Sequence, residues 1–322
     1  MRTGRHYFLA ALLAGGMAMA GCADLPSATG TFDRTLTVTG PVRLELNTGS
    51  GDVRVSTGAS GEVRIHAEFS VHAWPWENPS QRESGIAKNP PIEQQGNLIR
   101  VGQGGLGNVD IKYEIEVPPE TEAHAVTGSG DLEIHDIQGP LSISTASGDV
   151  TADGIAEQTQ VRTGSGSIEL SGIAAAVELS TGSGDSTLAS IQGEIRAHSG
   201  SGDIEVSQPG ADVAADTGSG DIVVSKMSAD LRLRTGSGDI TVDGQPADMS
   251  YWEVHTSSGD VQLRLGSTPS FRLDARSNSG DIQTSIPLVI EGSESKHELR
   301  AKAGDGKARI DVQTGSGGIT LE

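Results

Sequence analysis

The stretch TGSGDIVVSKMSADLRLRTGSGDI, residues 217–240, decides the fold. The phrase TGSGDI occurs twice in it, and Asp239 follows Asp221 by 18 residues. A catalytic loop is usually single, whereas a phrase that recurs at fixed spacing is typical of a repeat protein. The rest of the chain decides between these two interpretations.

Related phrases recur along the whole chain at regular intervals. From Asp131 to Asp239 the spacing is 18 residues six times running, with Ser167 in place of one aspartate, and the next two intervals are 21 residues. Such self-similarity predicts a solenoid. Eleven copies align, beginning at Thr48, Thr127, Thr145, Thr163, Thr181, Ser199, Thr217, Thr235, Thr256, Ser277 and Thr314.

Apolar residues keep fixed places within each repeat. The first and third residues after the aspartate are apolar, as in Ile222 and Val224, and so are the tenth and twelfth, as in Leu231 and Leu233. Alternation with period two predicts two half-buried strands per coil. We predict an all-β, single-stranded β-solenoid with 18-residue coils, right-handed by the usual rule for crossovers. Its inside is packed with aliphatic side chains.

The TGSGD phrase is first of all a turn between these strands. Gly128, Gly164 and Gly182 are expected to supply backbone angles that other residues avoid. The Thr and Ser hydroxyls are expected to bond to neighbours along the stack.

Calcium is the alternative for this phrase, because a calcium-binding β-roll uses a similar repeat. In that motif the aspartate lies two residues before the buried residue, whereas here it lies one before it, which favours the structural turn. Stacked carboxylates about 4.8 Å apart need water, main-chain N–H groups or cations between them. The candidate cation ligands are Asp131, Asp149, Asp185, Asp203, Asp221 and Asp239.

Composition narrows the function. The chain has 322 residues, 3% aromatic residues, 44 glycines and a formal net charge of -20. An acidic surface repels phosphate backbones, so we expect no nucleic-acid partner. Single, scattered histidines and the lack of a nucleophile motif predict no catalytic residues, no metal centre and no cofactor.

The N-terminus has the layout of an export signal. Residues 1–21 place Arg2 and Arg5 before an apolar run, and the only cysteine, Cys22, follows directly. This resembles the lipobox of bacterial lipoproteins, which predicts lipidation of Cys22, a tether over residues 22–31 and a membrane partner. Ala23 favours the outer membrane where the host has two membranes. The alternative is an ordinary signal peptide with a chance cysteine.

Residues 70–96 interrupt the repeat. This insert carries Trp74 and Trp76, two of the three tryptophans of the chain. Exposed tryptophans in a loop are candidates for binding a sugar or a protein. The other interpretation, which we favour, is a cap over the end of the solenoid, because solenoids need such caps.

The region from about residue 32 to residue 322 resembles a known bacterial family. The motifs are NLIRVGQGGLGNVDIKYEIEVPPETEAHAVTGSGDLEI at 97–134, the stacked TGSGDI units, and AGDGKARIDVQTGSGGITLE at 303–322. They are similar to the toast-rack family, whose members are proposed adhesins. The resemblance implies a β-solenoid of the cell envelope, with links to envelope stress systems in some members and no catalytic residues to carry over.

Together these observations predict a non-enzymatic, lipid-anchored envelope module for binding or scaffolding, with an envelope protein or glycan as partner. Two alternatives stay open: a calcium-dependent module that uses the aspartate row, and a polysaccharide-active enzyme of the β-helix type.

Overall fold

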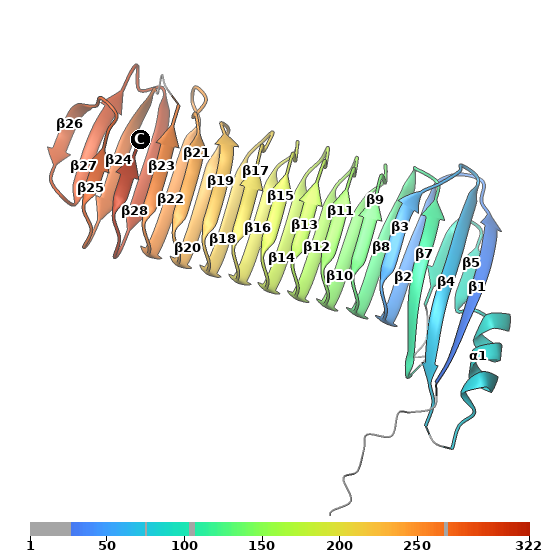
Figure 1. Ribbon diagram of the computed structural model, residues 1–322. Helices are drawn as coiled ribbons and strands as arrows, with labels where there is room; N and C mark the ends of the chain where they lie inside the picture. Colours follow the sequence, from blue (N-terminus) through green and yellow to red (C-terminus); the bar gives the residue numbers. More distant parts are fainter. Residues whose placement is uncertain (1–26, 75, 103–106, 267–269) are drawn as a thin grey trace, which may run out of the picture.

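The chain forms one elongated β-solenoid (Figure 1). The computed structural model describes residues 27–74, 76–102, 107–266 and 270–322. Two long sheets face each other along the rod, one of 14 strands (sheet A) and one of 15 strands (sheet B). The predicted all-β solenoid is confirmed.

The central coils each contribute one longer strand to sheet B and one shorter strand to sheet A. Neighbouring coils pair in parallel with a register shift of 18 residues, as in Leu141↔Thr159. The sheet B strands are β8 (Thr121–Ser129), β10 (Leu141–Ser147), β12 (Thr159–Ser165), β14 (Val177–Ser183), β16 (Ile195–Ser201), β18 (Val213–Ser219), β20 (Leu231–Ser237) and β22 (Tyr251–Ser258). The sheet A strands are β9 (Leu132–His135), β11 (Val150–Asp153), β13 (Ile168–Ser171), β15 (Ser186–Ala189), β17 (Ile204–Ser207), β19 (Ile222–Met227), β21 (Ile240–Gly244) and β23 (Val261–Leu265).

The N-terminal end departs from this parallel pattern. β2 (Val42–Ser50) and β3 (Val53–Thr57) form a first coil, and Thr48 stacks on Thr127, 79 residues later. The intervening chain extends both sheets outward. It forms β4 (Glu62–His72), α1 (Pro79–Lys88), β5 (Ile92–Gln95), β6 (Leu98–Val101) and β7 (Val109–Val117).

Three strands at this end run antiparallel to one another. β1 (Ser27–Thr37) is the edge of sheet A and pairs with β4, which pairs with β7. Because β1 begins at Ser27, residues 27–31 belong to the fold and not to the expected tether. Helix α1 lies at this end against β1 and β4 (Figure 1), so the insert covers the end of the rod.

The C-terminal end closes with a change of chain order. The final strands pair between the coil of β22 and β23 and the coil that precedes them in sequence. That preceding coil consists of β24 (Phe271–Ser277) and β25 (Ile282–Thr284), and the inserted strands are β28 (Ala308–Thr314) and β29 (Ile319–Leu321). The hairpin β26 (Val289–Glu294) and β27 (Glu298–Ala303) covers the outer edge of β24.

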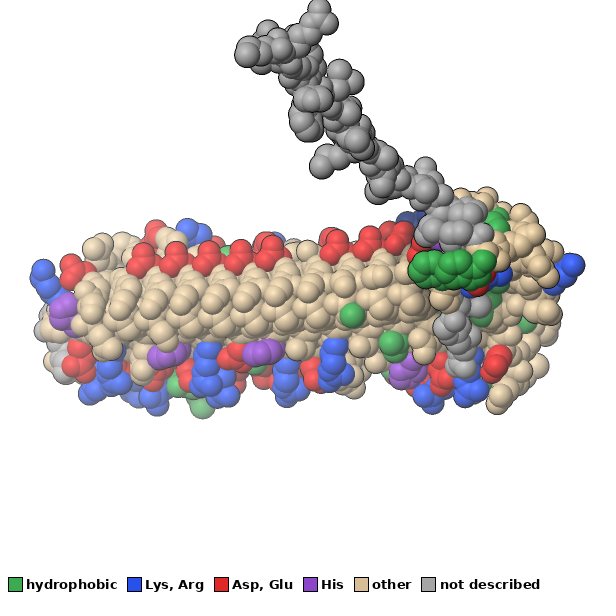
Figure 2. Space-filling model, turned by 90° about the horizontal axis from the view of Figure 1, so that it is seen from below, with side chains coloured by type: hydrophobic (Ala, Val, Ile, Leu, Met, Phe, Trp, Pro, Cys, Tyr) green, Lys and Arg blue, Asp and Glu red, His purple; other side chains and the backbone are tan. Residues whose placement is uncertain are grey.

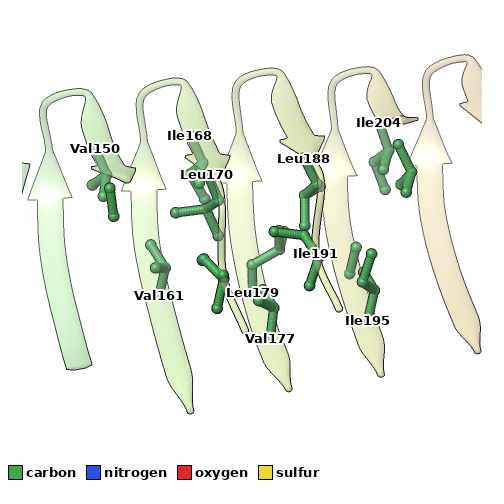
Figure 3. Close-up of a cluster of buried hydrophobic side chains, with 14 of the residues drawn as sticks. Val150, Val161, Ile168, Leu170, Val177, Leu179, Leu188, Ile191, Ile195 and Ile204 are labelled. Carbon is green, nitrogen blue, oxygen red and sulfur yellow. The ribbon is translucent and has the colours of Figure 1, made fainter. Parts of the chain in front are cut away.

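The core is a continuous stack of aliphatic side chains between the two sheets (Figure 3). Ile168 and Leu170 are buried, whereas Glu169 between them is exposed, as the alternating pattern predicts. Ile173, at the second corner of the same coil, is also fully buried. Stacking equivalent residues of successive coils fills the space between the sheets with aliphatic side chains.

The structure corrects the role assigned to the first glycine of the phrase. The left-handed φ belongs to the second glycine, with values of 125° at Gly130 and 131° at Gly184. A Cβ on Gly184 would lie 2.2 Å from the carbonyl oxygen of Gly166 in the preceding coil. Gly128, Gly164 and Gly182 have no left-handed φ, and Ala146 takes the same place in another coil.

Hydroxyl groups bond within the corner and also between coils. The Thr163 hydroxyl donates to the Ser165 carbonyl at 3.2 Å within its own coil. The Thr235 hydroxyl donates to the Gly220 carbonyl of the preceding coil at 2.9 Å. The expected bonding along the stack is therefore made by part of the row.

Candidate functional site

The aspartates of the repeated phrase form a row along one edge of the rod, where Figure 2 shows a line of acidic side chains. Each side chain faces outward, and one carboxylate oxygen accepts the main-chain N–H of the equivalent residue in the next coil. This bond is 2.8 Å from the Asp221 N–H to Asp203 and 2.7 Å from the Asp239 N–H to Asp221. Ser167 accepts no such bond in the described structure, so the row breaks there (Figure 2).

These bonds account for the stacking of like charges. All six candidates lie in the row, and each donor N–H brings a partial positive charge to a neighbouring carboxylate. Of the three ways to offset their repulsion, main-chain N–H groups are the one that the structure contains. Within the described residues no cluster of three or more His, Cys, Asp or Glu side chains is arranged to hold a metal ion. The geometry favours a structural corner.

The second candidate is the turn between β4 and α1. Trp74 is 49% exposed and Trp76 is 78% exposed. Their rings stack on each other, with centroids 5.4 Å apart and an angle of 4° between the planes. The structure thus brings together the two tryptophans that the sequence singled out, on the surface at the N-terminal end.

A third feature is a mixed charged face along sheet B, opposite the aspartate edge (Figure 2). Glu253 on β22 accepts from Arg234 at 2.7 Å and from Arg232 at 3.0 Å, both on β20. The hydrogen bond from Arg234 and the charges of both arginines lower the pKa of Glu253. Exposed pairs of this kind add little stability, and this face presents charge of both signs to solvent.

A groove of about 620 Å³ lies beside the antiparallel strands at the N-terminal end. The repeat pattern did not reveal it, because β1, β4 and β7 lie outside the 18-residue period. Its lining combines one cation with several carboxylates and hydroxyls. The lining includes Thr29, Glu68, Ser70, Asp110 and Lys112.

The predicted lipidation site, Cys22, and the signal segment over residues 1–21 lie outside the described residues. Within the described part of the chain, no helix has the length and apolar character needed to cross a bilayer.

Comparisons with known proteins place this geometry in context. A family model described as Toastrack DUF4097 matches residues 95–225 and 210–322. Similar solved structures include a proposed cell adhesion protein from Clostridium sporogenes, 11% identical, with a TM-score of 0.22 over 91% of this chain and 99% of that one. Another is a proposed adhesin from Bacteroides fragilis, 12% identical, with a TM-score of 0.31 over 91% of this chain and 97% of that one. No curated protein matches the chain.

Proposed function

Because the chain belongs to the Toastrack DUF4097 family, we propose that it is a non-enzymatic, adhesin-like module of the cell envelope that binds or scaffolds other molecules. One observation carries this proposal: aliphatic side chains fill the space between the sheets along the rod. Recognition therefore takes place on the outer faces, which are long and regular. A stiff rod with such faces suits attachment or scaffolding.

The proposal includes a lipid anchor at Cys22. Residues 1–21 supply the basic start and apolar run of an export signal, and Cys22 follows them directly. The acyl chains of a lipoprotein cysteine together hold a protein on a membrane, whereas one short chain holds it only weakly. Ala23 favours the outer membrane in a host with two membranes.

The partner is an envelope protein or glycan. The net charge of -20 disfavours nucleic acid and strongly anionic polymers. The mixed charged face of sheet B offers both donors and acceptors, as at Arg232 and Glu253, and the groove near Lys112 offers a second polar surface.

Capture of a partner tests the binding function. The lipidated protein, cross-linked in its own envelope and purified, should recover a protein or glycan that binds saturably and leaves chemically unchanged. Conversion of envelope glycan into shorter chains by the purified protein would contradict the proposal and favour the polysaccharide-active alternative.

Fractionation tests the anchor. Cys22→Ser should leave the chain soluble or as an uncleaved precursor, without incorporation of a labelled fatty acid. Ala23→Ser is the matched control and should keep the label. If Cys22→Ser protein still fractionates with membranes at its mature size, the anchor is wrong.

A further inference from the structure

Trp74 and Trp76 form an exposed apolar surface that the fold does not use. The third tryptophan, Trp252, is fully buried, and its Nε1 donates to the Ala229 carbonyl at 2.8 Å. Trp74 and Trp76 instead present 49% and 78% of their surface to solvent. Two large indoles kept in water lower the stability of the isolated protein, so their exposure points to contact with another phase or molecule.

The turn that carries them is held in place by its own contacts. The Glu77 N–H donates to the Trp74 carbonyl at 2.8 Å, and the Glu77 carboxylate accepts the Trp74 N–H at 3.2 Å. Arg82 on α1 lies 3.6 Å from the same carboxylate. Asn78 caps the helix by accepting the Ser80 N–H at 3.1 Å. These contacts fix the turn to the first turn of α1.

The turn lies where the chain enters the fold. Ser27, the first residue of β1, is paired with His72, the last residue of β4, and Trp74 follows two residues later. In Figure 1 the start of β1, the end of β4 and α1 meet at one corner of the rod. Five residue steps separate Ser27 from Cys22, which span at most about 18 Å.

We propose that Trp74 and Trp76 insert into the headgroup interface of the bilayer that holds the lipid of Cys22, and so fix the N-terminal end of the rod against the membrane. This inference rests on the proposed anchor. Indoles favour this interface because the ring is apolar and its N–H remains able to bond to headgroups or water. A tether of at most about 18 Å keeps the pair within reach of a headgroup layer.

A membrane suits the pair better than a glycan. The rings lie 5.4 Å apart and nearly parallel, so each covers one face of the other. This leaves fewer free ring faces for stacking on a sugar, while the outer faces and edges still form an apolar wedge. Glu77 beside the pair and the acidic body disfavour anionic lipids, so the lipid expected is zwitterionic.

Fluorescence of an anchored protein tests this contact. The mature chain beginning at Cys22 is coupled through its only thiol to a maleimide lipid in phosphatidylcholine vesicles, with or without brominated acyl chains. The emission should shift to shorter wavelength on coupling and lose intensity on brominated vesicles. Trp74→Ala with Trp76→Ala should abolish both effects, because the remaining Trp252 is buried.

The control separates this contact from general surface effects. Met249→Ala removes another exposed apolar side chain, 87% exposed and in the connection between β21 and β22, and should leave the quenching unchanged. Equal emission on both kinds of vesicle, or a response to isolated envelope glycan in place of lipid, overturns the proposal. Because the coupling is chemical, that result leaves the lipidation of Cys22 in cells to be judged by fractionation.

Discussion

Ser186 is a polar residue in a row of apolar inward side chains. It stacks between Ile168 and Ile204 in sheet A, is 1% exposed, and its hydroxyl has no hydrogen-bond partner in the described structure. A buried hydroxyl without a partner costs about 1–3 kcal/mol, because it gives up its bonds to water.

Ser186→Val should therefore raise the free energy of unfolding by about 1–2 kcal/mol, since it removes that hydroxyl and buries two methyl groups. Denaturant unfolding measures the change. Thr187→Val, at the neighbouring exposed position, is the matched control and should change stability by less than about 0.5 kcal/mol. A loss of stability in Ser186→Val would show that the row has no room for an apolar side chain there.

The two glycines of one corner should respond differently to a methyl group. Gly184 combines a φ of 131° with the approach of the Gly166 carbonyl, so Gly184→Ala should cost about 2 kcal/mol or more. Gly182→Ala should cost less, because its φ is ordinary and Ala146 stands at the same place. Equal losses in denaturant unfolding would refute the assignment of the strained position to the second glycine.

At the scale of strands, the central coils were predictable because every coil repeats the same alternation. The ends were not predictable, because their strands pair across long separations without a repeat. Leu321 at the end of the chain pairs with Leu263, and β28 enters between two strands that precede it in sequence. The antiparallel β1, β4 and β7, and the groove beside them, were missed for the same reason.

The second corner of each coil was also missed. The fifth residue after the aspartate has a left-handed φ in six successive coils, between 55° and 70°. Its type varies, because polar side chains tolerate this angle at modest cost, so no motif marks it. The residues are Asp136, Gly154, Gly172, Ser190, Gln208 and Lys226.

The ion pairs between β20 and β22 predict a dependence on pH. Arg234 and Arg232 lower the pKa of Glu253 from its model value of 4.5. Because the folded pKa is the lower one, the stabilisation is complete above the unfolded pKa and is lost as the pH falls through the folded pKa.

Glu253→Gln should thus reduce stability at pH 7 by about 0.5–1 kcal/mol, and its difference from the parent chain should shrink below about pH 4. Unfolding curves from pH 7 to pH 3 measure this difference. Glu169→Gln on β13 serves as the exposed control. A difference that stays constant over this range would mean that the arginines do not stabilise the carboxylate.

At the scale of the whole molecule, the repeated phrase makes the rod, and the outer faces are left for recognition. The aspartate row shows how the two levels meet, since each carboxylate bonds the next coil and still presents one oxygen to solvent. The sequence predicted the row and its outward direction. It could not choose among water, N–H groups and cations, because that choice depends on where the neighbouring N–H groups point.

Thermal unfolding of the mature chain in chelator and in millimolar calcium, with magnesium as the control ion, tests the structural role of the phrase most directly. If main-chain N–H groups stabilise the row, the melting temperature should change little, and Asp203→Asn should also change it little because the amide oxygen still accepts the Asp221 N–H. Four calcium ions bound at ~10 Kd each would add about 6 kcal/mol. A large rise in melting temperature that is selective for calcium, and that Asp203→Asn with Asp221→Asn abolishes, would contradict the account.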